Sequence, residues 1–406
     1  MSSRDEKMVK LTLQKIINFG IYLVVFLIPT YIFSFKIWLI PTNLLEALVS
    51  VLFLAWFIGN FNKIPEISRS MFKSSFFPPI LLIFLGASIS TIFSDDIITS
   101  AGIWKSWFIV PLLFFVVVLN AIKNGKQVQK IISSLFFSGF WVSLIALFYF
   151  FSHNLTYDGR LKAFYESPNH LAMYLSPILI LSLYLYFVFD KKIIKFFLFA
   201  AHCSLLVVLY LTYSYGAWIG LIASLFFLFV FQKLGFRNLV SNWKPGFCIF
   251  LLIVASFFAF QINSQKFQGM IDFSYPSLSS RLAIWQSAWE IIKDQPFNGI
   301  GPGLFQEYYL KYQVTLEPYL EWAVPQPHNL FLAFWLQTGL LGLLGFIWLL
   351  FRFFRIKINS LAIILMATMI CVLIHGLVDT TYWKNDLAVV FWLIIALNYK
   401  AIRLSY

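Results

Sequence analysis

The stretch PQPHNLFLAFWLQTGLLGLLGF, residues 325–346, sets the pattern for the whole chain. Two prolines precede a histidine and an asparagine, and an almost wholly apolar run follows that continues to residue 351. Roughly 20 mostly apolar residues are enough for a helix to cross the hydrocarbon core of a bilayer. The stretch therefore predicts a membrane-spanning helix with His328 and Asn329 at its entry.

The composition extends this interpretation to all 406 residues. The chain is 60% hydrophobic, 20% aromatic and only 12% charged, whereas soluble domains are about 25% charged. The apolar excess is spread over the whole length, which predicts a single membrane domain over residues 1–406. The net charge of +13 does not indicate a nucleic-acid-binding protein, because the basic residues stand in short clusters between long apolar runs.

We expect an all-α, polytopic integral membrane protein with about twelve transmembrane helices. Each expected span is an apolar run of sufficient length, bounded by polar residues. The spans are 16–35, 37–59, 76–94, 101–120, 131–151, 169–189, 193–213, 216–232, 246–262, 328–351, 360–378 and 386–402.

The charge pattern predicts which way these spans face. With the N-terminus inside, 21 of the 30 Lys and Arg residues fall in the segments expected to be cytoplasmic, and each such segment has its own basic cluster. Most acidic residues, among them Asp95, Asp96, Glu307 and Glu317, fall in the segments expected outside. This is the positive-inside pattern, and it predicts that both termini are cytoplasmic.

One segment expected outside, residues 263–327, is 65 residues long. Loops longer than about 15 residues without a purpose are uncommon. We expect an amphipathic helix at about 280–294 within it, with Ser279 or Ser280 capping its start and Pro296 ending it. Its apolar face would suit the membrane surface and contains residues that recur at intervals of three or four: Leu282, Trp285, Trp289 and Ile292.

Several residues near the expected outer face are candidates for chemistry. A histidine such as His328 titrates near neutral pH and suits a general base or proton shuttle, although an interfacial cap or anchor is the competing interpretation. Arg281 opens the amphipathic helix and could clamp a phosphate, or it could simply extend towards the interface. Arg160, beside Lys162 in a shorter outer loop, is either an anion site or ordinary solvated charge.

Ionisable groups within or beside spans are functional candidates because they are costly in a membrane. His375 and Asp379 stand four residues apart, on one helix face, and Lys105 lies about one turn inside another span. Gly301, within GIGPG, permits close approach to a ligand or simply a tight loop. The sequence contains no recognised metal-binding or ATP-binding motif, so we expect no cofactor.

Taken together, these motifs resemble those of the O-antigen ligase/polymerase superfamily. The long loop contains R-x3-W from Arg281, then P-x2-G-x-G-x-G from Pro296, then His328-Asn329 opening a span with TGLLG. The upstream segments GRLKAFYESPNHLAMY and LTYSYGAWIGL and the late segment HGLVD also resemble family elements. The resemblance covers about residues 160–380 by motif and the rest by topology alone.

The resemblance implies a GT-C-like, metal-independent glycosyltransferase of the bacterial inner membrane. Its donor would be a glycan on undecaprenyl pyrophosphate, used at the outer face, and its acceptor a hydroxyl on lipid A core, another glycan or a protein. His328 matches the family histidine and Arg281 one of its arginines. Tyr215 stands where the family has another arginine, so Arg160 or Lys105 is expected to supply the missing charge, with Asn329, Gly301, His375 and Asp379 as further substrate-binding candidates.

The alternatives remain open at this point. A polysaccharide polymerase or a protein O-oligosaccharyltransferase would use the same donor with another acceptor. A flippase or transporter would have internal repeats and charged residues near the membrane midplane, whereas the candidates here gather at one face. A scaffolding membrane protein would not need the clustered histidines and arginines.

Overall fold

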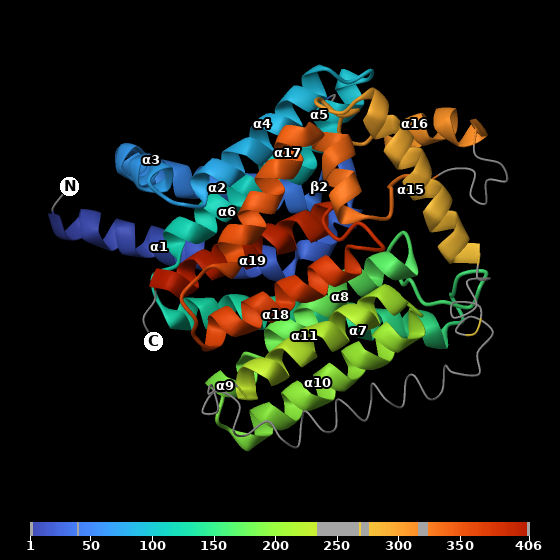
Figure 1. The fold of residues 1–406 in the computed structure, drawn as a ribbon. Coiled ribbons are helices and arrows are strands. Elements are labelled where there is room, and N and C mark those ends of the chain that lie inside the picture. The colour runs from blue at the N-terminus through green and yellow to red at the C-terminus, as the bar shows by residue number, and fades with distance from the viewer. Residues whose placement is uncertain (1–2, 39, 234–267, 269–275, 316–323, 404–406) are drawn as a thin grey trace.

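The computed structural model describes residues 3–38, 40–233, 268, 276–315 and 324–403. It is mostly helical (Figure 1). The elements, in chain order, are α1 (Ser3–Phe26), η1 (Ile28–Ile32), β1 (Ser34–Ile37), β2 (Ile40–Asn43), α2 (Leu44–Asn60), η2 (Phe61–Lys63), α3 (Ile64–Phe72), α4 (Phe77–Ile92), α5 (Ile97–Trp104), the π-helical turn η3 (Lys105–Ile109), α6 (Val110–Ala121), α7 (Gly125–Phe151), α8 (Pro168–Ser182), α9 (Leu185–Val188), α10 (Lys192–Leu211), α11 (Tyr215–Lys233), α15 (Pro276–Asp294), α16 (Phe305–Tyr312), η4 (Gln313–Thr315), α17 (Leu330–Phe354), α18 (Ser360–His375) and α19 (Asn385–Arg403).

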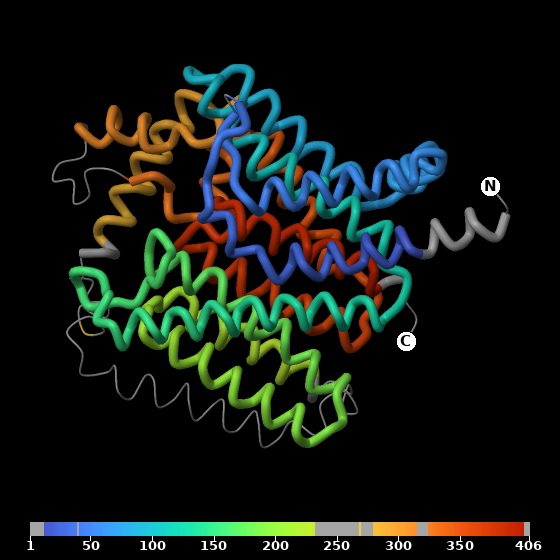
Figure 2. Tube along the Cα trace, turned by 180° about the vertical axis from the view of Figure 1, so that it is seen from behind, coloured from blue at the N-terminus to red at the C-terminus, as the bar shows by residue number. Residues whose placement is uncertain are grey.

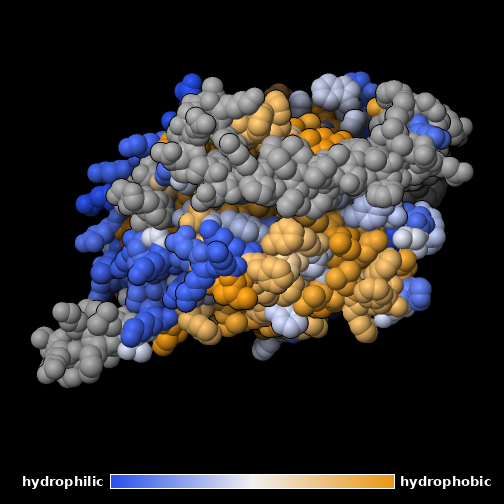
Figure 3. All heavy atoms as spheres, turned by 90° about the horizontal axis from the view of Figure 1, so that it is seen from below, coloured by the Kyte–Doolittle hydropathy of each residue, from blue (hydrophilic) through white to orange (hydrophobic). Residues whose placement is uncertain are grey.

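Most helices agree with the expected spans where the structure describes them. The exceptions are the first two spans, since α1 ends at Phe26 rather than at residue 35 and α2 begins at Leu44 rather than at residue 37. Six helical stretches are long and apolar enough to cross a membrane, and four shorter apolar helices accompany them within the described residues. The expected span 246–262 lies outside the described residues, so the total of twelve stays a prediction. Hydrophilic residues gather at one end of the molecule in Figure 3, and hydrophobic residues cover much of the adjoining flank. The architecture is that of a polytopic membrane protein.

The strictly all-α expectation is wrong at residues 34–43. Strands β1 and β2 form an antiparallel hairpin, with Phe35 opposite Thr42 and Lys36 opposite Pro41. The expected boundary between the first two spans, 16–35 and 37–59, lies inside this hairpin. Proline lacks an N–H and disrupts helix interiors, so Pro41 prevents a helix from continuing here, and α2 begins only after Asn43 caps its first turn through Glu46 N.

The bundle is built around α19, whose residues 387–397 are all buried. It packs against α6 and α18, and α17 packs closely against α4. Both chain ends lie at one end of the bundle, and α15 and α16 lie at the other (Figures 1 and 2). Helices α15 and α16 therefore cover the end of the bundle opposite the termini.

Glycines connect this covering segment to α17. Helix α17 is broken at Gly339, which has a φ of 65°. The break leaves the Leu336 carbonyl to accept a hydrogen bond from Ile300 N at 2.7 Å, and Leu340 N donates to the Phe297 carbonyl at 3.0 Å. A Cβ at position 299 would lie 2.3 Å from the Leu336 oxygen. The glycine turn thus packs into the break in α17. It hydrogen-bonds the backbone groups that the break leaves without partners in the helix.

The amphipathic helix exists but differs from its prediction. Helix α15 begins at Pro276, ahead of the serines that we expected to cap it, because proline is favoured in a first helical turn. Its buried side is formed by Ile284, Ala288 and Ile291, which belong to a small core shared with α16. Leu282 and Trp289, from the predicted apolar face, are 56% and 47% exposed. The helix therefore has an inner apolar face that the sequence interpretation did not identify.

Candidate functional site

A histidine and an aspartate pair at the end of the bundle that α15 covers. Nδ1 of His328 lies 3.1 Å from Oδ1 of Asp379, although 51 residues separate them in the chain. His328 comes directly before the N-cap of α17, and Asp379 lies in the turn after α18. The His328 side chain is 27% exposed and that of Asp379 only 4%. A carboxylate that accepts from Nδ1 fixes the ring so that Nε2 is the basic nitrogen.

The electrostatics keep Asp379 charged. Burial raises the pKa of its carboxyl, but the neighbouring His328, His375 and Arg281 outweigh this effect and lower the pKa well below its ordinary value. Asp379 Oδ1 also accepts a hydrogen bond from Thr380 N at 2.9 Å. An ionised, hydrogen-bonded carboxylate can both orient the imidazole and stabilise the imidazolium that forms when His328 takes a proton.

Arg160 reaches the same cluster through one intermediary. Its Nη2 donates to Asn169 Oδ1 at 2.6 Å, and Asn169 Nδ2 donates to Asp379 Oδ2 at 2.8 Å. Its Nε donates to the carbonyl of Thr212 at 2.8 Å, at the end of α10. Asn169 lies in the first turn of α8, two residues after Ser167, which caps the start of the helix. Arg160, Asn169, Asp379 and His328 thus form one continuous hydrogen-bonded chain.

Arg281 approaches from the long loop. It extends from α15, and its Nε donates to the Val378 carbonyl at 2.9 Å, one residue before Asp379. One turn further along α15, Trp285 Nε1 donates to the His328 carbonyl at 3.3 Å. The R-x3-W spacing therefore places an arginine and a tryptophan on one side of α15, where they hold the two segments that contain the histidine and the aspartate.

The backbone around His328 is fixed and strained. Asn329 caps α17 by accepting from the N–H groups of Phe331 and Leu332, and its Nδ2 donates to the Leu377 carbonyl at 3.0 Å. His328 has a φ of 46°, in the left-handed region that non-glycine residues avoid. Such conformations persist where surrounding contacts over-determine them, often at functional sites. Asn329 is therefore a positioning residue for His328.

His375 and Tyr215 lie at the inner border of the cluster. His375 is buried at the end of α18, near enough to Asp379 and Arg281 to interact with both charges. Tyr215, also buried, begins α11. The next residue, Gly216, packs on His375 so closely that a Cβ there would lie 2.8 Å from the ring. The position of the family arginine therefore does border the site, although a tyrosine occupies it.

Two predicted substrate residues belong to other surroundings. Lys105 pairs with Glu46 at 2.7 Å and donates to the Pro41 carbonyl at 2.5 Å, which joins the π-helical turn η3 to the hairpin. Gly301 is buried, and its N–H donates to Ser90 Oγ at 3.0 Å. A Cβ there would lie 2.5 Å from that of Ser94. Arg160, rather than Lys105, joins the cluster, and Gly301 is a packing position.

One participant, Asn169, was missed from the sequence. Asn169 links Arg160 to Asp379, and the segment PNH offered only a helix start as a signal. The next residue, His170, forms a second pair, with its Nε2 3.1 Å from Oδ1 of Asp386. This pair is almost completely buried, at 2% and 0% side-chain exposure. Among the described residues, no group of three or more His, Cys, Asp or Glu side chains is arranged to hold a metal ion.

The fold and this cluster define a polytopic membrane protein with cationic and basic side chains gathered at one end. Residues 196–347 match the family model described as O-Antigen ligase. Over this region the chain is therefore similar to the O-antigen ligase family, which agrees with the resemblance of its motifs. The matched region contains Arg281, Gly301 and His328, whereas Arg160, His375 and Asp379 lie outside it. None of the curated proteins matches the chain.

Proposed function

We propose that the chain is an O-antigen ligase-like glycosyltransferase. It moves a glycan from undecaprenyl pyrophosphate to an acceptor hydroxyl at the outer face of the bacterial inner membrane, within a GT-C-like fold and without a metal. The observation that carries this proposal is the partly exposed His328, paired through Nδ1 with the buried Asp379 and flanked by Arg281 and Arg160. A base next to cations matches what this transfer requires.

In the proposed reaction, His328 Nε2 takes the proton of the acceptor hydroxyl. The acceptor oxygen forms a bond to the anomeric carbon, while the bond from that carbon to the pyrophosphate oxygen breaks. The electron pair leaves with undecaprenyl pyrophosphate, whose added negative charge Arg281 and Arg160 stabilise. Fixed charges of this kind act without reorganisation and contribute strongly in a water-poor site. His328 then releases its proton to water.

The test is a transfer assay with the purified full-length protein in nanodiscs and an undecaprenyl-pyrophosphate-linked glycan. We expect glycan transfer and release of undecaprenyl pyrophosphate, unaffected by a chelator, and a loss of about 10²–10⁴-fold in His328→Ala, the usual contribution of a general base. Arg281→Ala should be inactive as well. The matched control is His153→Ala, because His153 is exposed and also has a left-handed φ, of 55°.

The acceptor decides between the related activities. Lipid A core, a second lipid-linked glycan and a hydroxyl-bearing peptide are offered in separate reactions, and the product identifies a ligase, a polymerase or a protein O-oligosaccharyltransferase. Movement of the lipid-linked glycan across vesicles with its pyrophosphate bond intact, and no transfer to any acceptor, would contradict the proposal in favour of a flippase. Equal activity of His328→Ala and His153→Ala would remove His328 from the mechanism.

A further inference from the structure

A cavity lies between α1 and α7, far from the candidate site. Helix α7 is 27 residues long, about 40 Å at 1.5 Å per residue, and only its far end leads into the loop that contains Arg160. The cavity is at its near end and measures about 430 Å³. Its walls are formed by Lys15, Asn18, Phe19 and Tyr22 of α1, Asn124 just before α7, and Lys126, Gln127 and Lys130 of α7.

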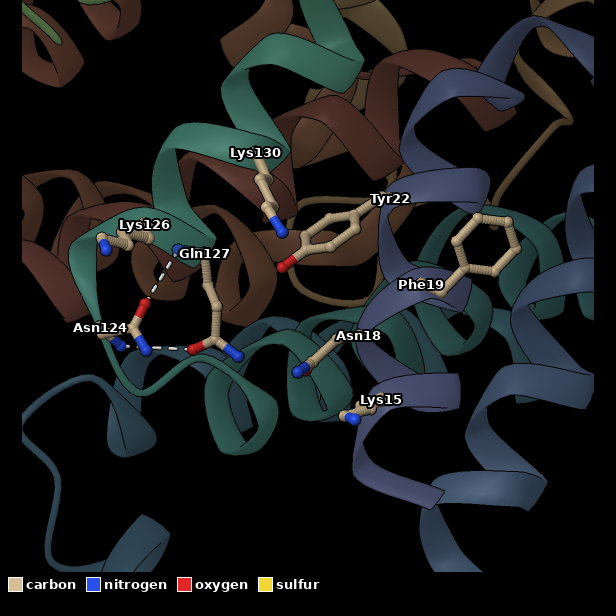
Figure 4. A pocket seen from close by; sticks show the side chains of 8 residues that line it. All are labelled: Lys15, Asn18, Phe19, Tyr22, Asn124, Lys126, Gln127 and Lys130. Carbon is tan, nitrogen blue, oxygen red and sulfur yellow. Dashed lines mark hydrogen bonds between the residues drawn. The ribbon is translucent and has the colours of Figure 1, made fainter. Parts of the chain in front are cut away.

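The lining is cationic. Three of the eight lining residues are lysines, and none is an aspartate or a glutamate. Lys130 Nζ lies 5.7 Å from the centre of the Tyr22 ring, across the gap between the two helices. Figure 4 shows the lysines and the amide side chains of Asn18 and Gln127 around one space. Amide N–H groups and ammonium groups are the donors that recognise phosphate oxygens.

Side chains of the chain itself cap the first turn of α7, so no bound anion is required there. Asn124 and Gln127 form a capping box, in which the Asn124 side chain accepts from Gln127 N at 3.0 Å. Gln127 Oε1 in turn accepts from Lys123 N at 2.6 Å. Because Gln127 uses its oxygen in the cap, its Nε2 is the end of the amide turned towards Asn18 (Figure 4). The attraction for an anion therefore rests on the lysines and amides.

Apolar surface continues from the cavity along both helices. On α1, Phe19 and Leu23 follow Lys15 at intervals of four residues and are 65% and 38% exposed. On α7, Trp141 and Phe148 are 53% and 69% exposed. They lie 11 and 18 residues after Lys130, which places all three on one helix face. An exposed apolar face with lysines at one end matches the two parts of a phospholipid.

We propose that this cavity binds the headgroup of an anionic phospholipid of the bilayer, with its acyl chains along the exposed faces of α1 and α7. The charge pattern predicts that this end is cytoplasmic, where basic pockets between helices recognise anionic headgroups. The lysines contact the phosphate oxygens, and the amides of Asn18 and Gln127 donate to the remaining headgroup oxygens. The lipid joins α1 to α7 at the end of the bundle opposite the candidate active site.

The experiment measures phosphatidylglycerol retained by the full-length protein, counted by native mass spectrometry after release from phosphatidylcholine nanodiscs doped with this lipid. In the variant Lys15→Gln/Lys126→Gln/Lys130→Gln we expect affinity for phosphatidylglycerol to fall about 100-fold, since each of the three lysines near a lipid surface contributes roughly fivefold. The matched control, Lys191→Gln/Lys192→Gln/Lys195→Gln, removes the same charge from a segment that does not line the cavity and should retain wild-type affinity.

Equal losses in the two variants would overturn the proposal, because they would indicate general attraction to charge. Displacement of phosphatidylglycerol by inorganic phosphate at equal concentration would also overturn it, since a soluble anion would then be the ligand. Unchanged thermal unfolding in pure phosphatidylcholine shows that the variants fold. If the triple variant does not fold, the exposed single substitutions Lys126→Gln and Lys192→Gln replace the pair. A weakening of about fivefold confined to the first supports the proposal, and equal affinities overturn it.

Discussion

Two histidine–aspartate pairs among the described residues have the same 3.1 Å separation in different surroundings. His328 bonds Asp379 through Nδ1 and is 27% exposed. His170 bonds Asp386 through Nε2, is almost wholly buried, and packs edge-on against the Tyr165 ring. Both pairs use the same chemical groups, so the pair itself does not define a reactive site. What makes a pair reactive is that a substrate can reach the second nitrogen of its histidine ring.

The two pairs are also neighbours, since consecutive residues of α8 contact both. Asn169 donates to Asp379, and His170 meets Asp386. Nδ1 of His170 is buried without a hydrogen-bond partner in the structure, so this ring has no path to a substrate. We interpret the His170–Asp386 pair as the internal support that fixes α8 against α19, and the His328–Asp379 pair as the reactive one.

The largest expected effect is on transfer activity, which should depend on the His328–Asp379 pair far more than on the His170–Asp386 pair. Asp379→Asn should lower the transfer rate about 10²–10⁴-fold, because an amide cannot stabilise the imidazolium and can hold the ring in the wrong tautomer. Asp386→Asn should stay within about tenfold of the wild type per folded molecule. The measurement is the initial rate of glycan transfer, normalised to folded protein. Similar losses in the two variants would show that both pairs serve one role.

The second expected effect is on stability, where the His170–Asp386 pair should matter more than the His328–Asp379 pair. Asp386→Ala should lower the free energy of unfolding by about 1–3 kcal/mol, the usual cost of leaving a buried polar group, here His170, without its hydrogen-bond partner. Denaturant titration in detergent, followed by tryptophan fluorescence, measures it. Asp379→Ala serves as the comparison and should cost less, because water can reach the exposed side of His328. Equal costs would mean that exposure does not distinguish the pairs.

The smallest effect comes from the surface ion pair beside His170. Lys384 pairs with Glu166, whose side chain is 62% exposed. Exposed ion pairs contribute roughly 0–1 kcal/mol, so Glu166→Gln should change the unfolding free energy by no more than about 1 kcal/mol in the same titration. Raising the salt concentration should reduce the difference further. A loss as large as that of Asp386→Ala would place Glu166 within the internal support.

Much of the fold was predictable because the responsible signals are local. Apolar runs and basic clusters located most of the described spans to within a few residues. The exceptions are α1, the hairpin and the start of α15, and the short helices α3 and α16 were not expected. At residues 34–43 a short apolar segment suits a helix or a strand equally well by hydrophobicity, and Pro41 decided between them. The buried face of α15 was missed because both of its faces contain apolar residues.

The sequence predicted which residues belong to the candidate site better than it predicted how those residues contact one another. The sequence identified His328, Arg281, Arg160, His375 and Asp379 from their residue types and their places near helix ends. It placed Asp379 on one helix face with His375, and it treated Arg160 and Lys105 as equal substitutes for the arginine replaced by Tyr215. It gave no signal for Asn169 as a link, because an asparagine at a helix start is common.

The sequence alone determined that this chain is a helical membrane protein whose motifs resemble those of the ligase family, because span length, charge clusters and motif spacing are properties of neighbouring residues. Only the tertiary structure decided that His328 meets Asp379, that Arg160 joins them through Asn169, and that Lys105 belongs to Glu46. These partners lie 51, 9, 210 and 59 positions apart along the chain. Contacts at the longer of these separations depend on how helices pack, which no local pattern specifies.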